Sequence, residues 1–246
     1  MEPEPREKKI AWQSQTADGQ VLLSMPWEIF VLCVAVLSIV NLVLAILLRD
    51  PDLNQVIVVI DFILVAIFAI DLLRRLRVAD DNRAYLIHGY GWLDVISIFP
   101  ALRIARILRI VKVTRILQRM GGAEAAVKAF FVNKATGGLL MVFFIAIMVL
   151  EFGSLLVLWA EEAAPGATIT SAQDAVWYVI VTMSTVGYGD TYPVTQLGRL
   201  FGALIIVVGV GVFGTLTGFL ANAFLSSSSE PDESARSTAE EKPASS

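Results

Sequence analysis

Long apolar runs separated by short polar stretches are the feature that most restricts how this chain can fold. The runs at residues 27–48, 135–160 and 197–225 carry a single charged residue each. An α-helix that crosses a lipid bilayer needs about 20 predominantly apolar residues, and each run reaches that length. Because 56% of the 246 residues are hydrophobic and only 17% are charged, the composition favours a membrane protein over a soluble domain.

We expect an all-α membrane protein with six transmembrane helices. The spans are predicted at residues 27–48, 54–73, 84–100, 101–120, 135–160 and 197–225. Hydropathy alone is weak for the third and fourth spans, because the third contains His88 and Asp94 and the fourth carries six cations. A further apolar segment at residues 171–183 is too short to cross. It is predicted to be a re-entrant helix, surrounded by protein or by a water-filled cavity.

The charged flanks orient the predicted spans. Arg74, Arg75 and Arg77 follow the second span at once, and the positive-inside rule places such a cluster in the cytoplasm. The first 26 residues carry charges of both signs and precede an apolar run longer than a signal-peptide core of about 7–15 residues, so no cleaved signal is expected. With six crossings, both termini are predicted to be cytoplasmic in a multi-pass protein of the plasma membrane.

The charge balance and the motif content argue against two classes of function. A net charge of -4 and a pI near 5.1 do not suit a nucleic-acid partner, because such binding requires a basic surface that neutralises phosphates. The sequence contains no recognisable nucleotide-binding loop, metal-ligand cluster or nucleophile with its base. We therefore expect neither an enzyme nor a bound cofactor.

The strongest local motif follows the re-entrant segment. It reads Thr185-Val186-Gly187-Tyr188-Gly189-Asp190. A backbone whose successive carbonyl groups all point at one axis needs dihedral angles that a Cβ atom resists, and Gly187 and Gly189 permit them. The same residues could form a glycine-rich hairpin turn in a soluble protein. Because the motif lies between a short apolar helix and a full span, we favour a site lined by backbone carbonyl groups over a hairpin turn.

This hexapeptide resembles the selectivity filter of potassium channels, and residues 27–225 as a whole resemble prokaryotic voltage-gated potassium channels of the six-transmembrane, Shaker-like superfamily. The resemblance implies that the carbonyl groups of residues 185–188, with the Thr185 hydroxyl, bind K⁺, and that Gly189 completes the filter. K⁺ is then the permeant ion rather than a cofactor. It also implies a tetrameric channel, a homotetramer in membrane lipid, because one chain supplies only one strand of the filter.

The residues that flank the filter extend the resemblance. Trp177 and Tyr178 occupy places in the re-entrant pore helix that are aromatic in the family. The resemblance implies that their rings form a cuff that holds Tyr188 outward, and that the Trp177 indole donates a hydrogen bond to Asp190 behind the filter. Ordinary interfacial aromatic residues are the alternative interpretation.

A second pattern lies in the fourth predicted span, where cations recur at every third residue. They are Arg103, Arg106, Arg109, Lys112 and Arg115. Residues three apart follow a spiral around an α-helix and align in one row on a 3₁₀-helix. Charges inside a bilayer are costly unless they are paired, and they mark functional sites. The pattern is typical of a voltage-sensing helix that carries gating charges.

Acidic partners for these cations are present in the second and third spans. Asp61, Phe68 and Asp71 stand at positions i, i+7 and i+10, within about 80° on one helical face, and Asp94 lies in the third span. The spacing is similar to the charge-transfer centre of voltage-gated potassium channels. That resemblance implies that Phe68 is the aromatic plug, that Asp71 and Asp94 are the inner acids, and that Asp61 is the outer counter-charge.

Three alternatives remain open at this point. A basic amphipathic helix could lie on the membrane surface and bind anionic lipids. The four-helix unit could also resemble a sensor without responding to voltage, since Pro100 stands where the first arginine of the family is expected and little chain separates Asp94 from Arg103. A secondary potassium transporter would belong to a different class, although no second filter-like segment suggests the internal repeats of such proteins.

The predicted domain organisation follows from these patterns. It comprises a cytoplasmic N-terminal segment at residues 1–26, a voltage-sensor domain at 27–120, a linker helix at 121–134, a pore domain at 135–225 and a disordered cytoplasmic tail at 226–246. The length of the linker favours a domain-swapped assembly, in which each sensor lies beside the pore domain of a neighbour. Gly209 and Gly218 are candidate hinges of a gate in the last span, with close helix packing as the alternative.

Overall fold

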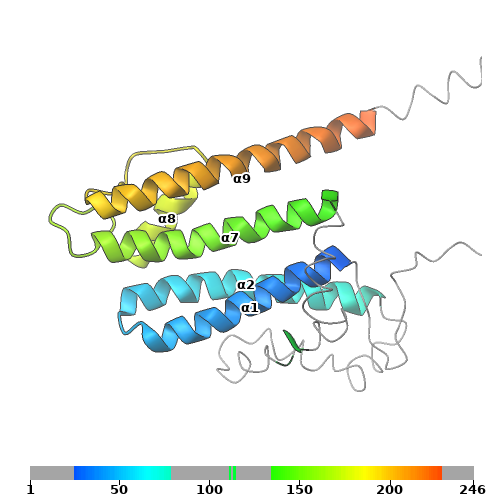
Figure 1. The fold of residues 1–246 in the computed structure, drawn as a ribbon, viewed down its shortest axis with the longest axis horizontal. Helices are drawn as coiled ribbons and strands as arrows, with labels where there is room; N and C mark the ends of the chain where they lie inside the picture. The colour runs from blue at the N-terminus through cyan, green and yellow to red at the C-terminus, as the bar shows by residue number, and fades with distance from the viewer. Residues whose placement is uncertain (1–24, 79–110, 112, 115–133, 229–246) are drawn as a thin grey trace, which may run out of the picture.

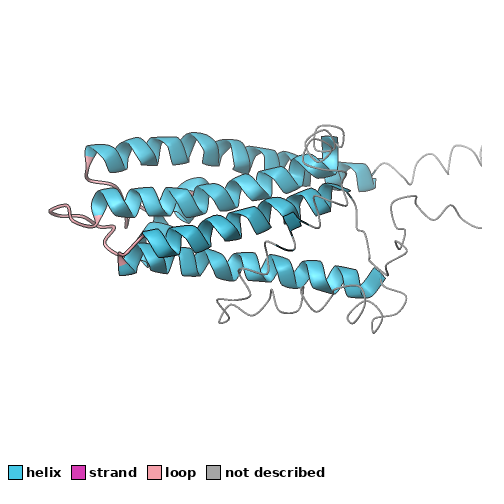
Figure 2. Ribbon diagram, turned by 60° about the horizontal axis from the view of Figure 1, so that its bottom comes forward, coloured by secondary structure: helices cyan, strands magenta, loops and turns pink. Residues whose placement is uncertain are grey.

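The computed structural model describes residues 25–78, 111, 113–114 and 134–228 (Figure 1). Its helices are α1 (Met25–Leu47), α2 (Pro51–Val78), α7 (Lys134–Glu161), α8 (Ala172–Met183) and α9 (Gln196–Ser228). The four long helices lie side by side, and the short α8 lies near one end of α7 and α9 (Figures 1 and 2). The third predicted span, nearly all of the fourth span and of the linker helix, and almost all of both terminal segments lie outside the described residues.

Four of the helices are long and apolar enough to cross a membrane. They are α1, α2, residues Gly137–Glu161 of α7 and residues Gln196–Leu225 of α9. The first, second, fifth and sixth predicted spans are therefore present as helices, and the chain is a multi-pass membrane protein. At 12 residues, α8 is too short to cross, as expected for the segment predicted at residues 171–183.

The start of α2 differs from the prediction because a cap and a proline define it. The Asp50 side chain accepts hydrogen bonds from the backbone amides of Asp52 and Leu53 at 2.8 and 3.1 Å, which is the bonding of an N-cap residue. Pro51 occupies the first helical position, where its missing N–H costs nothing. The helix therefore begins at Pro51 rather than at residue 54, and it continues through the basic cluster to Val78.

Two apolar clusters join the first helix pair to the later helices. In one cluster, Leu64 and Phe68 of α2 lie with residues of α1 and with Ile147 of α7, all of them buried. In the other, Ile57 of α2 lies with Leu158 of α7 and with residues of α8. The α1–α2 pair thus packs against α7 and α8 of its own chain. This packing within one chain favours an arrangement in which each α1–α2 pair lies beside its own later helices, whereas the predicted domain-swapped assembly concerns contacts between subunits and stays a prediction.

The last helix is the least covered of the four. Within its apolar window only 17% of the residues are buried, against 44% for α1 and for α2. Val207 on α9 is 73% exposed, and exposed apolar side chains continue along the helix on several sides. Other chains or lipid must therefore cover most of α9 in a membrane.

Candidate functional site

A capping box fixes the start of α8. The Ser171 hydroxyl accepts from the Asp174 amide, and the Asp174 carboxylate accepts from the Ser171 amide at 3.1 Å. Partial burial raises the pKa of Asp174, but hydrogen bonds from Ser171 and Thr170 outweigh that effect and hold the pKa below its usual value. The negative charge lies at the positive end of the helix dipole. The other end of α8, with its carbonyl groups, leads into the TVGYG motif.

The last turn of α8 holds the first residues of the motif. The amide of Thr185 donates to the Thr182 carbonyl at 3.1 Å. The amides of Val186 and Gly187 both donate to the Val181 carbonyl, at 3.1 and 3.3 Å. Because these amides are bonded to the helix, the motif is anchored by its donors, and its own carbonyl groups remain available for other partners.

The backbone of the motif alternates in conformation. Thr185, Gly187 and Gly189 have φ angles of 60°, 59° and 78°, so every second residue is left-handed. Of the described residues, Thr185 alone has a positive φ without being glycine, and a β-branched residue in this region is strained. Alternation between left-handed and ordinary backbone turns successive carbonyl groups toward one side of a strand. Residues 185–190 are all exposed in the single chain, so this row of acceptors faces away from the chain's own core.

Aromatic contacts attach the outer end of the motif to α8. The Trp177 indole nitrogen donates to Asp190 Oδ2 at 2.7 Å, which is the hydrogen bond that the resemblance implied. The rings of Trp177 and Tyr188 stack at 5.8 Å with 6° between their planes. Tyr178 lies elsewhere: it is buried, and a Cβ added at Gly202 of α9 would lie 2.5 Å from its hydroxyl oxygen. Tyr178 therefore fixes α8 against α9, whereas Trp177 contacts the filter residues.

A buried carboxylate ties the end of α7 to the start of α9. Glu161 is fully buried, and it accepts from the amides of Val194 and Thr195 at 2.8 and 2.9 Å. It also accepts from the Thr195 hydroxyl at 2.6 Å, and that hydroxyl accepts from the Gly198 amide at 2.9 Å. The sequence analysis gave Glu161 no role, because it appeared as one more acid at the end of a span. These hydrogen bonds hold the segment between the TVGYG motif and α9 against the end of α7.

The neighbouring acid is in a different environment. Glu162 is only partly covered, and burial together with the charges of Asp50 and Asp52 raises its pKa above the usual value. The α1–α2 turn therefore lies close to the end of α7, at the same end of the molecule as the filter (Figure 1).

Replacing Gly198 with alanine is expected to destabilise the pore helices. A Cβ atom at this position would overlap Glu161 Oε1 and displace the carboxylate from the amides of Val194 and Thr195. Buried amides without an acceptor cost about 1–3 kcal/mol each, so we expect a loss of about 2–5 kcal/mol in unfolding free energy. Thermal unfolding in detergent measures this loss. Gly138→Ala on α7 is the matched control, since a Cβ there meets nothing within 4 Å among the described residues, and equal midpoints for the two variants would contradict the prediction.

The two candidate hinge glycines differ in surroundings. Helix α9 is continuous through Gly209 and Gly218. A Cβ at Gly209 would lie 2.8 Å from Met183 Cα, so this glycine allows α9 to approach the end of α8 closely. A Cβ at Gly218 would meet nothing within 4 Å. The structure therefore gives Gly209 a packing role, and a hinge at Gly218 stays a prediction.

A buried charge cluster joins α1 to α2 at the end of the molecule opposite the filter. Arg75 lies 2.8 Å from Glu28 of α1 and 3.1 Å from Asp71, with all three side chains nearly inaccessible. Asp71 also accepts from the Trp27 indole at 2.9 Å. The sequence analysis placed Arg75 in the basic cluster after the second span, and Glu28 is the single charged residue of the first apolar run. Both are buried because the helix continues beyond the apolar run and pairs them.

The other residues of the predicted sensor fall into two groups. Asp61 and Phe68 are buried and, like Asp71, lie on the face of α2 that packs inward. The predicted gating cations Arg103, Arg106, Arg109, Lys112 and Arg115, and the acid Asp94, lie outside the described residues. The grouping of the three α2 residues on one face agrees with their spacing, while their role toward the cations stays a prediction.

A comparison with protein families shows the family to which the chain belongs. The family model described as ion transport protein matches residues 24–230 of the 246. This chain belongs to the ion transport protein family. The match includes both the buried charge cluster of α1 and α2 and the filter region, and the family is not a class of enzymes.

Several relatives in the ion transport family are potassium channels. The chain is similar to a voltage-gated potassium channel of Aeropyrum pernix, with 34% identity over 30% of this chain and 25% of the relative. It is similar to a voltage-gated potassium channel regulatory subunit of Rattus norvegicus, with 30% identity over 50% of this chain and 24% of the relative. A calcium-gated potassium channel of Thermoplasma volcanium is 41% identical over 31% of this chain and 22% of the relative. The chain thus matches about a quarter of the length of each.

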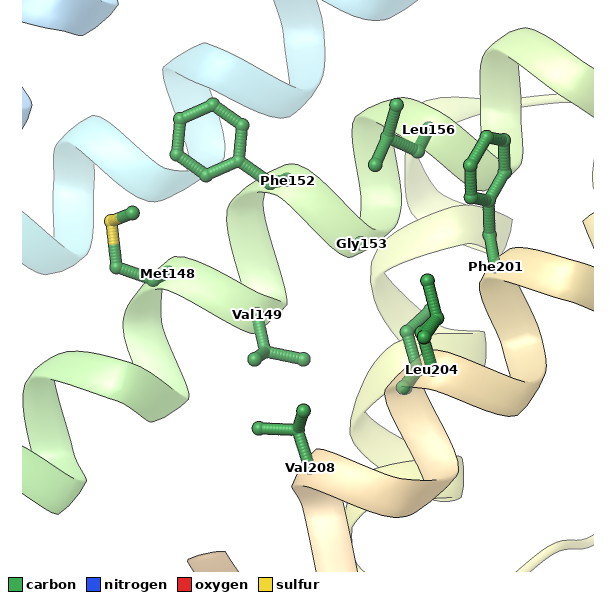
Figure 3. A pocket seen from close by; sticks show the side chains of 9 residues that line it. Met148, Val149, Phe152, Gly153, Leu156, Phe201, Leu204 and Val208 are labelled. Atoms are coloured by element: carbon green, nitrogen blue, oxygen red, sulfur yellow. The ribbon is translucent and has the colours of Figure 1, made fainter.

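A pocket between α7 and α9 offers no place for an ion. It has a volume of about 340 Å³ (Figure 3). Its walls are Met148, Val149, Phe152, Gly153, Leu156, Phe201, Leu204, Ile205 and Val208. None of these side chains can replace the hydration shell of a cation. In this family member, the row of backbone acceptors at residues 185–189 is the better candidate for contact with an ion.

Proposed function

We propose that this chain is one subunit of a homotetrameric, potassium-selective channel of the plasma membrane, with both termini in the cytoplasm. The alternating backbone at Thr185, Gly187 and Gly189 carries the proposal, because it presents successive carbonyl groups to one side. Such a row can replace the water shell of K⁺ at little cost when four copies surround the ion. K⁺ passes through the site and is not retained as a cofactor.

Two features of the single chain support the assembly. The filter residues are exposed although they end a helix that is packed within the chain, so their acceptors need a partner from outside. Most of α9 is also uncovered. Four chains arranged around one axis would bring four filter strands together and cover α9 with neighbouring helices. In this assembly each α1–α2 pair lies beside the pore helices of its own chain.

The negative end of α8 adds an electrostatic contribution. The last carbonyl groups of a helix carry a partial negative charge of about half an elementary charge, and α8 ends at Met183, two residues before Thr185. Four such ends would surround the inner end of the filter. They would stabilise a cation there before it loses its water.

We further propose that residues 27–120 form a voltage sensor. The inward-facing acids Asp61 and Asp71 support this proposal, because they lie on the face where a cation-bearing fourth helix could pair with them. One charge that crosses the full potential contributes about 2.3 kcal/mol per 100 mV. About three charges in each of four subunits would therefore supply on the order of 28 kcal/mol per 100 mV. That energy is sufficient to bias a gate.

Current recorded from reconstituted channels while the voltage is stepped tests the sensor. We expect open probability to depend steeply on voltage, and we expect Arg109→Gln and Lys112→Gln to reduce the steepness. If open probability is constant, the four helices resemble a sensor without acting as one, and the channel proposal is unaffected.

Flux into lipid vesicles tests the channel itself. Purified protein should pass K⁺ and its close analogue Rb⁺ and exclude Na⁺, at a rate that does not saturate at low millimolar concentration. Saturating flux with a fixed stoichiometry to a second ion would instead indicate a secondary transporter. Equal flux of K⁺ and Na⁺ would contradict the selectivity.

A further inference from the structure

Glu151 is an acid in the middle of a membrane span that the proposed mechanism does not use. It lies on α7, and its side chain is fully buried. The α1–α2 pair packs against α7, so α7 lies between this pair and α9 (Figure 1). Asn41 of α1 and Asp61 of α2 lie close enough to act on its carboxyl group. Three helices therefore converge on one polar site inside an apolar layer.

Among the described residues, the polar atoms of Glu151 and Asn41 lack the hydrogen bonds that an ordinary structural cluster would give them. Within the described ranges, neither carboxyl oxygen of Glu151 forms a hydrogen bond of standard geometry, and the same holds for both amide atoms of Asn41, which is also fully buried. An ionised carboxylate is very costly to keep in such surroundings, whereas a protonated carboxyl is not. A protonated carboxyl and a primary amide also match each other, since the carboxyl O–H can donate to the amide oxygen while an amide N–H donates to the carboxyl carbonyl oxygen.

One charge in the described part of the chain opposes a negative charge on Glu151. In the described part of the chain, Asp61 is the titratable group that acts on it, and its negative charge opposes a second one nearby. Helix α1 contributes the uncharged Asn41. Two residues further along α7, beside Gly153, helices α8 and α9 contribute the apolar side chains of Val179 and Ile205.

We propose that Glu151 is a proton-binding site that couples the α1–α2 pair to the pore helices. With the proton bound, the Glu151 carboxyl pairs with the Asn41 amide and holds α1 against α7. When the proton leaves to solvent, a negative charge remains beside Asp61 in an apolar layer, and the contact between the helix pair and α7 loosens. Proton uptake from water reverses the change. The contact between the α1–α2 pair and α7 therefore depends on pH.

Infrared spectroscopy of the protein in lipid tests the bound proton without any reference to conduction. The carbonyl stretch of a protonated carboxylic acid is separate from that of a carboxylate. We expect the wild type at neutral pH to show a protonated-acid band that Glu151→Gln lacks and Glu151→Asp retains. Asn41→Leu should shift this band, because the carboxyl loses its amide partner. A wild-type spectrum that is identical to that of Glu151→Gln in this region would overturn the proposal.

Potassium flux across a range of pH tests the coupling, and this arm rests on the proposed channel function. Between about pH 6 and about pH 9 we expect wild-type flux to change several-fold, Glu151→Gln to change at most about twofold, and Glu151→Asp to keep the dependence. If the infrared band is present but wild type and Glu151→Gln share one pH profile, Glu151 binds a proton without coupling it to the pore, and the coupling is refuted. If no variant conducts K⁺ while the band behaves as expected, the channel proposal fails and the proton site stands.

Discussion

Gly187→Ala is expected to abolish potassium-selective conduction while leaving the fold intact. Gly187 has a φ of 59°, and an L-residue in this region costs about 1–2 kcal/mol. A Cβ at this position meets nothing within 4 Å in the single chain, so the backbone can relieve its strain by rotating. Rotation turns a carbonyl group away from the row of acceptors. In a tetramer the change occurs four times around one ion, and we expect K⁺ flux to fall by more than about tenfold.

Gly166→Ala is the matched control for this prediction. Gly166 lies in the loop after α7 with a φ of 77°, and a Cβ there also meets nothing within 4 Å. The two variants therefore carry the same backbone penalty in equally open surroundings. Thermal midpoints should agree between them, while K⁺ flux in vesicles should be lost only in Gly187→Ala. If the control loses flux to the same extent, general destabilisation rather than the filter explains the effect.

Arg75→Met is expected to destabilise the protein more than any other substitution in the first two helices. The guanidinium lies between the buried carboxylates of Glu28 and Asp71, and removal of one partner from a buried ion pair costs about 3–5 kcal/mol. Methionine retains much of the side-chain volume, so a loss of charge rather than a cavity produces the effect. Thermal or denaturant unfolding in detergent measures it.

The adjacent cluster supplies a control and a compensating variant for Arg75. Arg77 is exposed on the same turn of α2, and Arg77→Met should change stability by no more than about 0.5 kcal/mol. Glu28→Gln combined with Arg75→Met should recover part of the loss, because one of the two buried negative charges is then removed as well. Equal stability of the Arg75 and Arg77 variants would show that the cluster contributes nothing measurable.

The parts of the fold that local chemistry defines could be predicted from the sequence. Span length and apolar composition located α1, α2, α7 and α9, because the bilayer requires a minimum length whatever the rest of the chain does. The left-handed backbone at positions 187 and 189 could be predicted because glycine accepts such dihedral angles easily. The start of α2 was misplaced because hydropathy does not register the Asp50 cap.

The contacts that depend on helices distant in sequence could not be predicted in the same way. Glu161 and Gly198 are separated along the chain, and nothing in either local pattern indicates that the missing Cβ makes room for the carboxylate. Glu28 and Arg75 appeared as flanking charges, since pairing across two helices leaves no periodic trace. The packing of the α1–α2 pair on its own α7 depends on apolar faces that are compatible with either subunit arrangement.

The zero-current potential of a single channel, recorded in a planar bilayer with K⁺ on one side and Na⁺ on the other, tests the central claim most directly. If four copies of the backbone at residues 185–189 select K⁺ by replacing its water shell, the potential lies far toward the equilibrium potential of K⁺, and it collapses in Gly187→Ala but not in Gly166→Ala. A wild-type potential near zero in these solutions would contradict the account.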